Sequence, residues 1–133
     1  MVWNFLLTRR KGLAGVLDLT YRRENHMADH IRITPGGRYR IRLGEVVIGE
    51  TERALHLVEG VRGPVVYVPR ADMRMELLTP TSRRTSCPWK GEANYFSIGE
   101  AANVVWSYET PLAGAEGIAG CLAFYPAVTV ERV

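Results

Sequence analysis

The most unusual segment of this chain is the turn Thr85-Ser86-Cys87-Pro88-Trp89-Lys90-Gly91. It gathers a thiol, two hydroxyls and an amine, the side chains from which nucleophiles, bases and anion-binding groups are made. Pro88 makes the turn rigid, and Gly91 makes its backbone permissive. We therefore expect Thr85, Cys87 and Lys90 to contribute to a ligand site.

Lys90 is the only lysine after Met27, where every other basic residue is an arginine. A lone lysine can act through a lowered pKa as a base or Schiff-base former, or it can hold an anionic ligand. The alternative is an ordinary solvated turn residue, and the sequence leaves both readings open.

Cys87 is a candidate nucleophile if nearby positive charge lowers the pKa of its thiol. A cysteine nucleophile normally works with a histidine, and the three histidines, His26, His30 and His56, all lie in the N-terminal half. The alternative is a small residue packed beneath the turn.

A second polar group follows an expected strand, where Arg70 and Arg74 flank Asp72. Binding residues are often found at strand ends. Asp72 is expected to pair with Lys90 or with an arginine, or to serve as an acid or base. The alternative is a capped turn with a local ion pair.

Four aromatic residues could form the apolar wall of the same site. Trp106 and Tyr108 lie two residues apart and so share one face of a strand. Together with Tyr67 and Tyr95 they could bind a flat or apolar ligand. The alternative is that all four belong to the ordinary core.

Short strands must position these side chains. Arg38–Leu43 alternates regularly, which places Tyr39, Ile41 and Leu43 toward the core and the arginines toward water. The expected strands are Arg38–Leu43, Val46–Ile48, Ala54–Glu59, Val65–Val68, Asn94–Ile98, Val104–Tyr108, Cys121–Tyr125 and Val128–Val130.

Glycine and proline mark the connections between these strands. Gly36-Gly37 and Gly44-Glu45 are expected turns, and Pro80 to Gly91 is expected to be irregular. Met73–Leu78 fits either a strand or a helical turn, and Pro111 to Gly120 fits one short helix. The fold class is therefore mainly β, a small antiparallel sandwich or open barrel with at most one short helix.

Composition fits a single domain of an ordinary globular protein, with 133 residues and 47% hydrophobic residues. The two cysteines lie far apart, which favours a reducing, cytoplasmic compartment. No four Cys or His residues stand at zinc-ligand spacings, and no apolar run nears the roughly 18 residues of a membrane span. We expect no metal, no cofactor and no membrane contact.

The net charge of +3 is unevenly placed. Five basic and two acidic residues precede Met27, which leaves twelve of each from Met27 onward. Nucleic-acid binding needs a basic surplus on one face, so it is disfavoured for residues 27–133. Residues 1–26 are expected to be a poorly ordered extension, and residues 27–133 a single β domain.

These segments together resemble a bacterial family known as domain of unknown function 427 (DUF427), over about Asp29 to Val133. The family's pattern begins near His30, which supports reading residues 1–26 as an extension foreign to it. The resemblance is carried by Tyr67-Val68-Pro69-Arg70 with Asp72, Thr85 to Ala93 with Tyr95, Trp106-Ser107-Tyr108 with Pro111, Ile118, and Ala123-Phe124-Tyr125.

The resemblance implies a β-tent-like fold, in which two small antiparallel sheets meet at an angle with a cleft between them. Zinc-binding relatives of that architecture carry paired cysteines, which this sequence lacks. The family is sometimes filed under a nucleotidyltransferase heading. The sequence has no Asp-x-Asp pair and no phosphate-binding glycine loop to support that chemistry.

Our hypothesis is a cleft that binds an unidentified small molecule. The expected lining residues are Tyr67, Arg70, Asp72, Thr85, Cys87, Lys90, Tyr95, Trp106 and Tyr108. If the cleft is catalytic, Lys90, Asp72 and Cys87 are the candidate catalytic residues, with Asp72 orienting Lys90. The alternative is a non-catalytic interaction module, in which an Asp72–Lys90 ion pair only holds the turn together and Cys87 is fully buried. A homo-oligomer is compatible with either reading.

Overall fold

A computed structural model describes residues 30–133 and shows two four-stranded antiparallel sheets. The first sheet has the order β3-β2-β1-β8, formed by β1 (Ile31–Leu43), β2 (Val46–Glu59), β3 (Val65–Tyr67) and β8 (Thr129–Arg132). The second has the order β4-β5-β6-β7, formed by β4 (Thr79–Cys87), β5 (Gly91–Ile98), β6 (Ala101–Tyr108) and β7 (Leu122–Phe124). The expected small antiparallel β sandwich or open barrel is confirmed.

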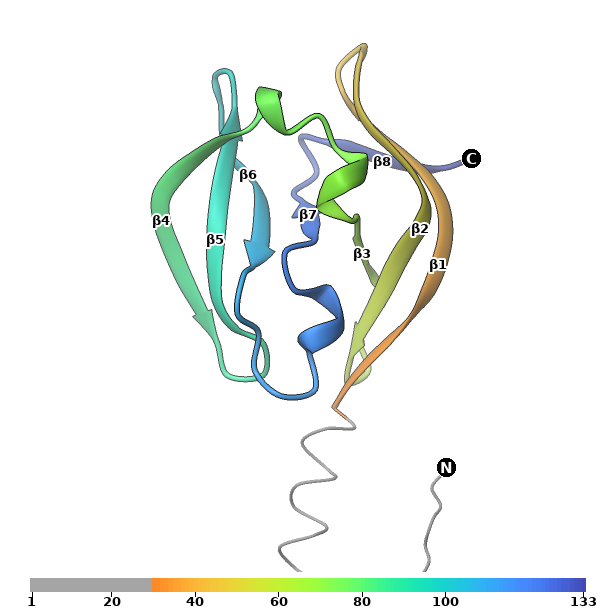
Figure 1. Ribbon diagram of the computed structural model, residues 1–133, viewed down its shortest axis with the longest axis vertical. Helices are drawn as coiled ribbons and strands as arrows, with labels where there is room; N and C mark the ends of the chain where they lie inside the picture. The colour runs from red at the N-terminus through yellow and green to blue at the C-terminus, as the bar shows by residue number, and fades with distance from the viewer. Residues whose placement is uncertain (1–29) are drawn as a thin grey trace, which may run out of the picture.

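The two sheets meet where β3 and β7 lie side by side. Val68 and Leu122 exchange two backbone hydrogen bonds across this junction, at 2.8 and 2.9 Å. Figure 1 shows β4, β5 and β6 on one side of the domain and β1 and β2 on the other, with β3 and β7 between them. The strands therefore form two sheets, one of which curls into a half-barrel.

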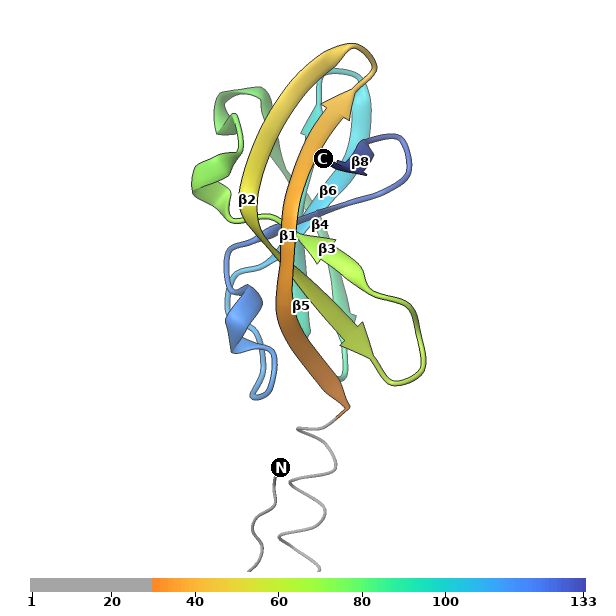
Figure 2. The ribbon, with the colours of Figure 1, turned by 90° about the vertical axis from the view of Figure 1, so that its right-hand side faces the viewer.

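The long hairpin of β1 and β2 runs the length of the domain (Figure 2). Gly44-Glu45 forms its turn, as expected, and Gly44 has a φ of +61°, a conformation that favours glycine. Tyr39 and Ile41 of β1 are buried, as the alternating pattern predicts.

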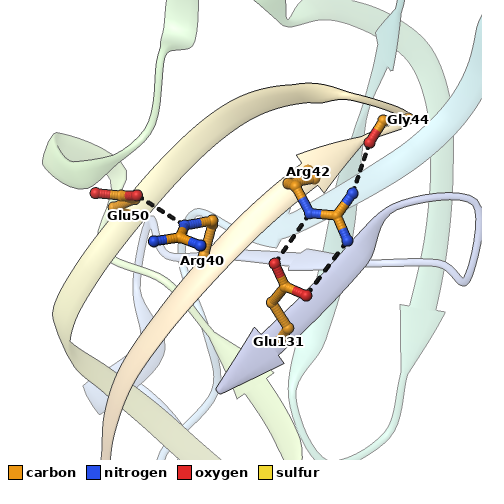
Figure 3. Close-up of polar contacts among 5 residues, drawn as sticks. All are labelled: Arg40, Arg42, Gly44, Glu50 and Glu131. Carbon is orange, nitrogen blue, oxygen red and sulfur yellow. Dashed lines mark hydrogen bonds and ion pairs between the residues drawn. The ribbon is translucent and has the colours of Figure 1, made fainter. Parts of the chain in front are cut away.

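The outer face of β1 carries arginines that pair with carboxylates of the neighbouring strands (Figure 3). Arg40 donates to Glu50 of β2 at 2.9 Å, and Arg42 donates to Glu131 of β8 at 2.9 Å. Arg42 also donates to the carbonyl oxygen of Gly44 at 2.7 Å. Cross-strand pairs of this kind strengthen strand pairing and help to define its register.

Two hydrophobic clusters fill the interior. The larger one includes Ile41, Ile48, Val68, Val105 and Leu122, all of which are almost fully buried. The second includes Leu57, Tyr67, Tyr95, Tyr108, Ile118, Cys121 and Ala123. The second cluster holds three of the four aromatic residues expected at the site, and Trp106 packs against it.

Three local expectations from the sequence were wrong. Gly36-Gly37 is an irregular position inside β1, where the pairing with β2 shifts register, and not a turn before it. The segment Ala54–Glu59 is the second half of β2 and not a separate strand. The stretch from Pro80 toward Gly91 is mostly strand β4, because its backbone pairs with β5, and only Pro88 to Lys90 form a turn.

Short 3₁₀ helices occur in two of the connections, between β3 and β4 and between β6 and β7. They are η1 (Arg70–Asp72), η2 (Met75–Leu77) and η3 (Glu116–Ile118). The helical-turn alternative for Met73–Leu78 is thus confirmed by η2, and the expected short helix between Pro111 and Gly120 is only the single 3₁₀ turn η3. Residues 30–133 contain no α-helix and no helix long and apolar enough to cross a membrane. The expected extension, residues 1–26, lies outside the described residues.

Candidate functional site

The site begins at the turn between β4 and β5. Cys87 and Gly91 are paired residues that close the hairpin, so Pro88, Trp89 and Lys90 form its loop. Gly91 has a φ of +108°, which a residue with a Cβ adopts only with strain. The backbone N–H of Leu112 donates to the carbonyl oxygen of Lys90 at 3.0 Å. The turn that carries Lys90 is therefore held from two sides.

Lys90 forms an ion pair with Glu59, the last residue of β2. The distance from Nζ to Oε1 is 2.5 Å, and the two side chains are only 12% and 14% exposed. Figure 1 shows the β4–β5 turn and the end of β2 at the same end of the domain. Glu59 and not Asp72 is thus the carboxylate that orients Lys90.

Trp89 of the turn contacts His30, and His30 lies beside Glu59. The ring of Trp89 lies 4.1 Å from that of His30, between ring centroids, and His30 Nε2 lies 3.7 Å from Glu59 Oε2. Partial burial acts to raise the pKa of Glu59, but Lys90, helped by Arg62 and His30, outweighs it and holds that pKa below its ordinary value. Glu59 is therefore a carboxylate at neutral pH.

A cavity of about 240 Å³ opens beside this ion pair. Both sheets contribute to its walls. Its lining residues are Leu57, Glu59, Arg62, Gly63, Val65, Tyr67, Lys90, Tyr95, Trp106, Tyr108 and Tyr125. One end is therefore charged, while the rest is mainly aromatic.

Contacts among the aromatic residues fix the walls of the cavity. The indole N–H of Trp106 donates to the hydroxyl of Tyr67 at 3.3 Å. The ring of Tyr125 lies 4.8 Å from that of Trp106 and stacks on Tyr95 at 6.4 Å, with ring planes 12° apart. Such contacts limit side-chain rotation and keep the wall in one shape.

Tyr95 is held from behind by the edge strand β4. Its hydroxyl and that of Thr85 share a hydrogen bond of 2.8 Å, and the guanidinium of Arg83 lies 4.9 Å from its ring centroid. Burial acts to raise the pKa of Tyr95, but hydrogen bonds with Thr85, Tyr125 and Arg83 outweigh it and lower that pKa. Thr85 therefore positions a wall residue and is not itself part of the cavity lining.

Tyr67 is the most deeply buried tyrosine of the cavity, and Tyr108 is also buried. Burial raises the pKa of both, so both remain neutral phenols at neutral pH. Lys90 Nζ lies 5.7 Å from the ring centroid of Tyr108, within the range of a cation–π contact.

Asp72 belongs to a different group of contacts. Its carboxylate accepts hydrogen bonds from Thr51 at 2.7 Å and from Arg53 at 3.1 Å. These bonds, first from Arg53 and then from Thr51, lower the pKa of Asp72. Figure 1 shows η1, which ends at Asp72, toward the end of the domain opposite the β4–β5 turn. Asp72 thus pairs with an arginine, one of its expected partners, and ties η1 to β2.

Arg70 also lies outside the cavity lining. It donates to the carbonyl oxygen of Gly120 at 3.0 Å and to Glu109 at 2.5 Å, and its guanidinium lies 5.5 Å from the ring centroid of Phe96. These contacts hold η1 against the second sheet.

Cys87 is half-buried and packs against the second hydrophobic cluster, and it does not line the cavity. Cys121 is buried within the same cluster, and burial raises the pKa of its thiol. Neither cysteine forms a disulfide. Of the nine residues expected at the site, the structure brings five to the cavity: Tyr67, Lys90, Tyr95, Trp106 and Tyr108.

Sequence reasoning missed three functional candidates: Glu59, Arg62 and Tyr125. Glu59 ends an expected strand just before Gly60, so the strand-end argument applied to Asp72 would have found it as well. Arg62 lies in the following loop, and Tyr125 directly follows β7. Neither of these two had a spacing signal, because the pairing of distant strands brings them to the cavity.

The cavity combines charged and neutral polar groups with an aromatic wall. Lys90, Arg62 and Glu59 provide donors and one acceptor, and the tyrosines provide neutral hydroxyls. Within residues 30–133, no three His, Cys, Asp or Glu side chains come together to hold a metal ion. The structure thus defines a two-sheet antiparallel β domain with an aromatic-walled cavity.

The chain belongs to the family described as a domain of unknown function, DUF427, whose family model matches residues 32–133. The resemblance seen in the sequence is therefore confirmed. A comparison with curated proteins found no match. The family description carries no activity, so any function must be argued from the cavity itself.

Proposed function

We propose that the cavity beside Lys90 binds a small organic anion, with the charged group at Lys90 and the rest against the aromatic wall. The observation that carries the proposal is a Glu59–Lys90 ion pair that is largely shielded from solvent and yet lines an open cavity. Removing two charges from water is costly, so a shielded ion pair often adds little net stability. Stability alone is therefore a weak reason for this pair to lie beside a cavity.

The charges of the lining favour an anion. Lys90 and Arg62 are opposed by the single carboxylate of Glu59, which leaves one net positive charge. The ammonium of Lys90 has three N–H donors, and within residues 30–133 only Glu59 accepts a hydrogen bond from it. The other two donors are therefore available to a ligand.

The aromatic wall favours a flat or apolar body. Tyr67, Tyr95, Trp106 and Tyr108 line the cavity, and Tyr125 adds a fifth ring. Aromatic faces bind flat rings and alkyl groups through their large contact area. A volume of about 240 Å³ is slightly below the usual range for drug-sized ligands, which fits a small metabolite.

The cavity beside Lys90 and the incomplete burial of Cys87 weigh against the alternative of a purely structural motif. That alternative required an Asp72–Lys90 ion pair and a fully buried Cys87. Lys90 instead pairs with Glu59, and Cys87 is only half-buried. Catalysis is not part of the proposal, because Asp72 and Cys87 do not line the cavity with Lys90.

The proposal keeps a cytoplasmic setting, a small-molecule partner and the option of a homo-oligomer as expectations from the sequence. Nucleic acid and membrane remain disfavoured partners. The two free cysteines, Cys87 and Cys121, fit a reducing compartment.

A thermal-shift screen of a metabolite library against the full chain tests this proposal. A ligand at one hundred times its dissociation constant adds about 2.7 kcal/mol of stability. We expect organic anions among the hits, and we expect Lys90→Met to abolish their shifts. The matched control is Arg84→Met, which removes an exposed cation of β4 whose guanidinium, among residues 30–133, donates only to backbone carbonyl oxygens.

Retention of the shifts in Lys90→Met, or their equal loss in Arg84→Met, would contradict the proposal. Anions that bind the wild type and Arg84→Met but not Lys90→Met would support it. Because Lys90→Met leaves Glu59 without its partner, Glu59→Gln/Lys90→Met serves as a second variant that removes the charge without isolating a carboxylate. The same loss of binding is expected in both.

A further inference from the structure

A second cavity, of about 450 Å³, adjoins the one beside Lys90. Its lining residues are Tyr39, His56, Pro64, Val65, Val66, Trp106, Phe124 and Val130. Val65 and Trp106 line both cavities. The two spaces are therefore neighbours that share a wall.

Trp106 is one of the two residues of that shared wall. Its indole N–H faces the Lys90 cavity, where it donates to Tyr67, and its ring packs against Tyr125. The same side chain lines the second cavity together with Phe124 and Val130. An apolar group bound against Trp106 could thus extend from one cavity into the other.

The second cavity is lined by aliphatic and aromatic groups except at one end, where Tyr39 meets His56. Arg132 donates to the hydroxyl oxygen of Tyr39 at 3.1 Å, and Tyr39 Oη lies 2.9 Å from His56 Nε2. Since Arg132 can only donate, the hydroxyl proton of Tyr39 is free to satisfy His56. This polar end is internally paired, so it does not require a polar ligand.

The irregularity in β1 builds this end of the cavity. A Cβ added at Gly36 would lie 2.5 Å from His56 Cδ2, so the imidazole lies against β1 only because residue 36 has no side chain. Gly37 has a φ of +91°, and its neighbour Gly36 accepts a hydrogen bond from Arg132 at 3.1 Å. The glycine pair that the sequence suggests as a turn instead makes room for His56 and Arg132.

We propose that the two cavities are the two halves of one binding site, and that its ligand is an elongated amphipathic monocarboxylate. The inference rests on the proposed function. The carboxylate lies at Lys90, and the apolar body passes Trp106 into the space between Val66 and Val130. One net positive charge in the Lys90 cavity matches a single negative charge on the ligand. The paired polar end and the apolar walls of the second cavity match an uncharged hydrocarbon.

Straight-chain carboxylates of four to ten carbons, titrated calorimetrically into the full chain, test the inference. Transfer of a CH₂ group into an apolar site improves affinity about fourfold. We expect the dissociation constant to fall by about that factor for each added carbon that enters the second cavity. The four-carbon acid, confined to the Lys90 cavity, is expected to bind most weakly.

Val66→Phe is the matched probe of the second cavity, because it adds bulk to a residue that lines that cavity and not the Lys90 cavity. Its control is Val47→Phe, the same change at an exposed valine of β2 that lines neither cavity. We expect Val66→Phe to weaken the ten-carbon acid at least tenfold and to leave the four-carbon acid unchanged. Val47→Phe is expected to change neither.

The outcomes separate this inference from the proposed function. Binding that depends on Lys90 but does not improve with chain length overturns the inference alone. The same holds if Val66→Phe weakens short and long acids equally. If no acid of any length binds, the inference is overturned, and the metabolite screen decides the proposed function independently.

Discussion

Two pairs of a carboxylate with a cation in this domain lie in different surroundings. Glu59 pairs with Lys90, and Asp72 pairs with Arg53. In both, the cation lowers the pKa of the carboxyl group. The Glu59 and Lys90 side chains are 14% and 12% exposed, whereas those of Asp72 and Arg53 are 23% and 63% exposed.

The difference shows why the types of residue in a sequence segment do not by themselves identify a site. An exposed ion pair is weakened by water and salt and contributes little, so the Asp72–Arg53 pair mainly orients η1. The Glu59–Lys90 pair lies beside a cavity, where poor solvation strengthens its interaction with any bound charge. Burial and the adjacent cavity, and not the motif, distinguish the candidate site.

The largest expected effect is the loss of stability in Lys90→Met. This change leaves the carboxylate of Glu59 shielded from water without its partner. We expect the free energy of unfolding to fall by about 2 kcal/mol, less than for a fully buried pair, because both side chains retain some exposure. Urea denaturation at pH 7 measures this.

The control for Lys90→Met is the double variant Glu59→Gln/Lys90→Met, in which no charge is isolated. We expect it to recover most of the lost stability. If the double variant is less stable than Lys90→Met, the cost arises from lost packing of the lysine side chain, and the contrast between the two ion pairs would be wrong on this point.

A smaller effect is expected in the pH dependence of stability. The pKa of Glu59 is lower in the folded protein than in the unfolded chain, so the unfolded state binds more protons in acid and stability rises with pH. The stability difference between the wild type and Glu59→Gln should therefore reach its full size at pH 7. It should shrink as the pH falls below about 4.3, the ordinary value for glutamate.

Asp72→Asn provides the comparison in the same titration. The pKa of Asp72 is also lowered, so its contribution disappears in the same direction, as the pH falls through the folded pKa. At pH 7 we expect the contribution of Asp72 to the free energy of unfolding to be smaller than that of Glu59. Unfolding curves at several pH values measure both, and equal starting values would remove the distinction that burial predicts.

The smallest expected effect is that of Asp72→Asn at pH 7. The hydrogen bond from Thr51 can be retained by the amide oxygen, and Arg53 is exposed enough to find water instead. We expect the melting temperature to change by no more than about 2 °C and the binding of any anion at Lys90 to be unchanged. A loss of binding would show that Asp72 contributes to the binding site.

Much of the fold follows from local pattern. The alternation in Arg38–Leu43 predicts which residues of β1 are buried, and Gly44-Glu45 predicts the hairpin turn. The pattern fails for β4, whose sequence Thr79–Cys87 is polar and contains a proline. Because β4 is an edge strand with little burial, its pairing with β5 and not its own hydrophobicity defines it.

The sequence predicted only those features of the candidate site that depend on residue type or local spacing. Lys90 is exceptional by residue type, and Trp106 and Tyr108 share a strand face by their spacing, so both features can be seen in the sequence. Glu59 lies thirty-one positions from Lys90, and its partnership depends on where β2 ends in space. Without the fold, Asp72 is an equally good partner for the lysine.

The sequence by itself determines the antiparallel β class, the DUF427 family and the unusual turn that carries Lys90, because these depend on residue types and short-range periodicity. Only the tertiary structure decides that Glu59 is the partner of Lys90 and that Gly36 accommodates His56 within β1. These features arise where strands far apart in the chain lie side by side. Local pattern carries no information about such neighbours, since pairing and packing across the two sheets fix them.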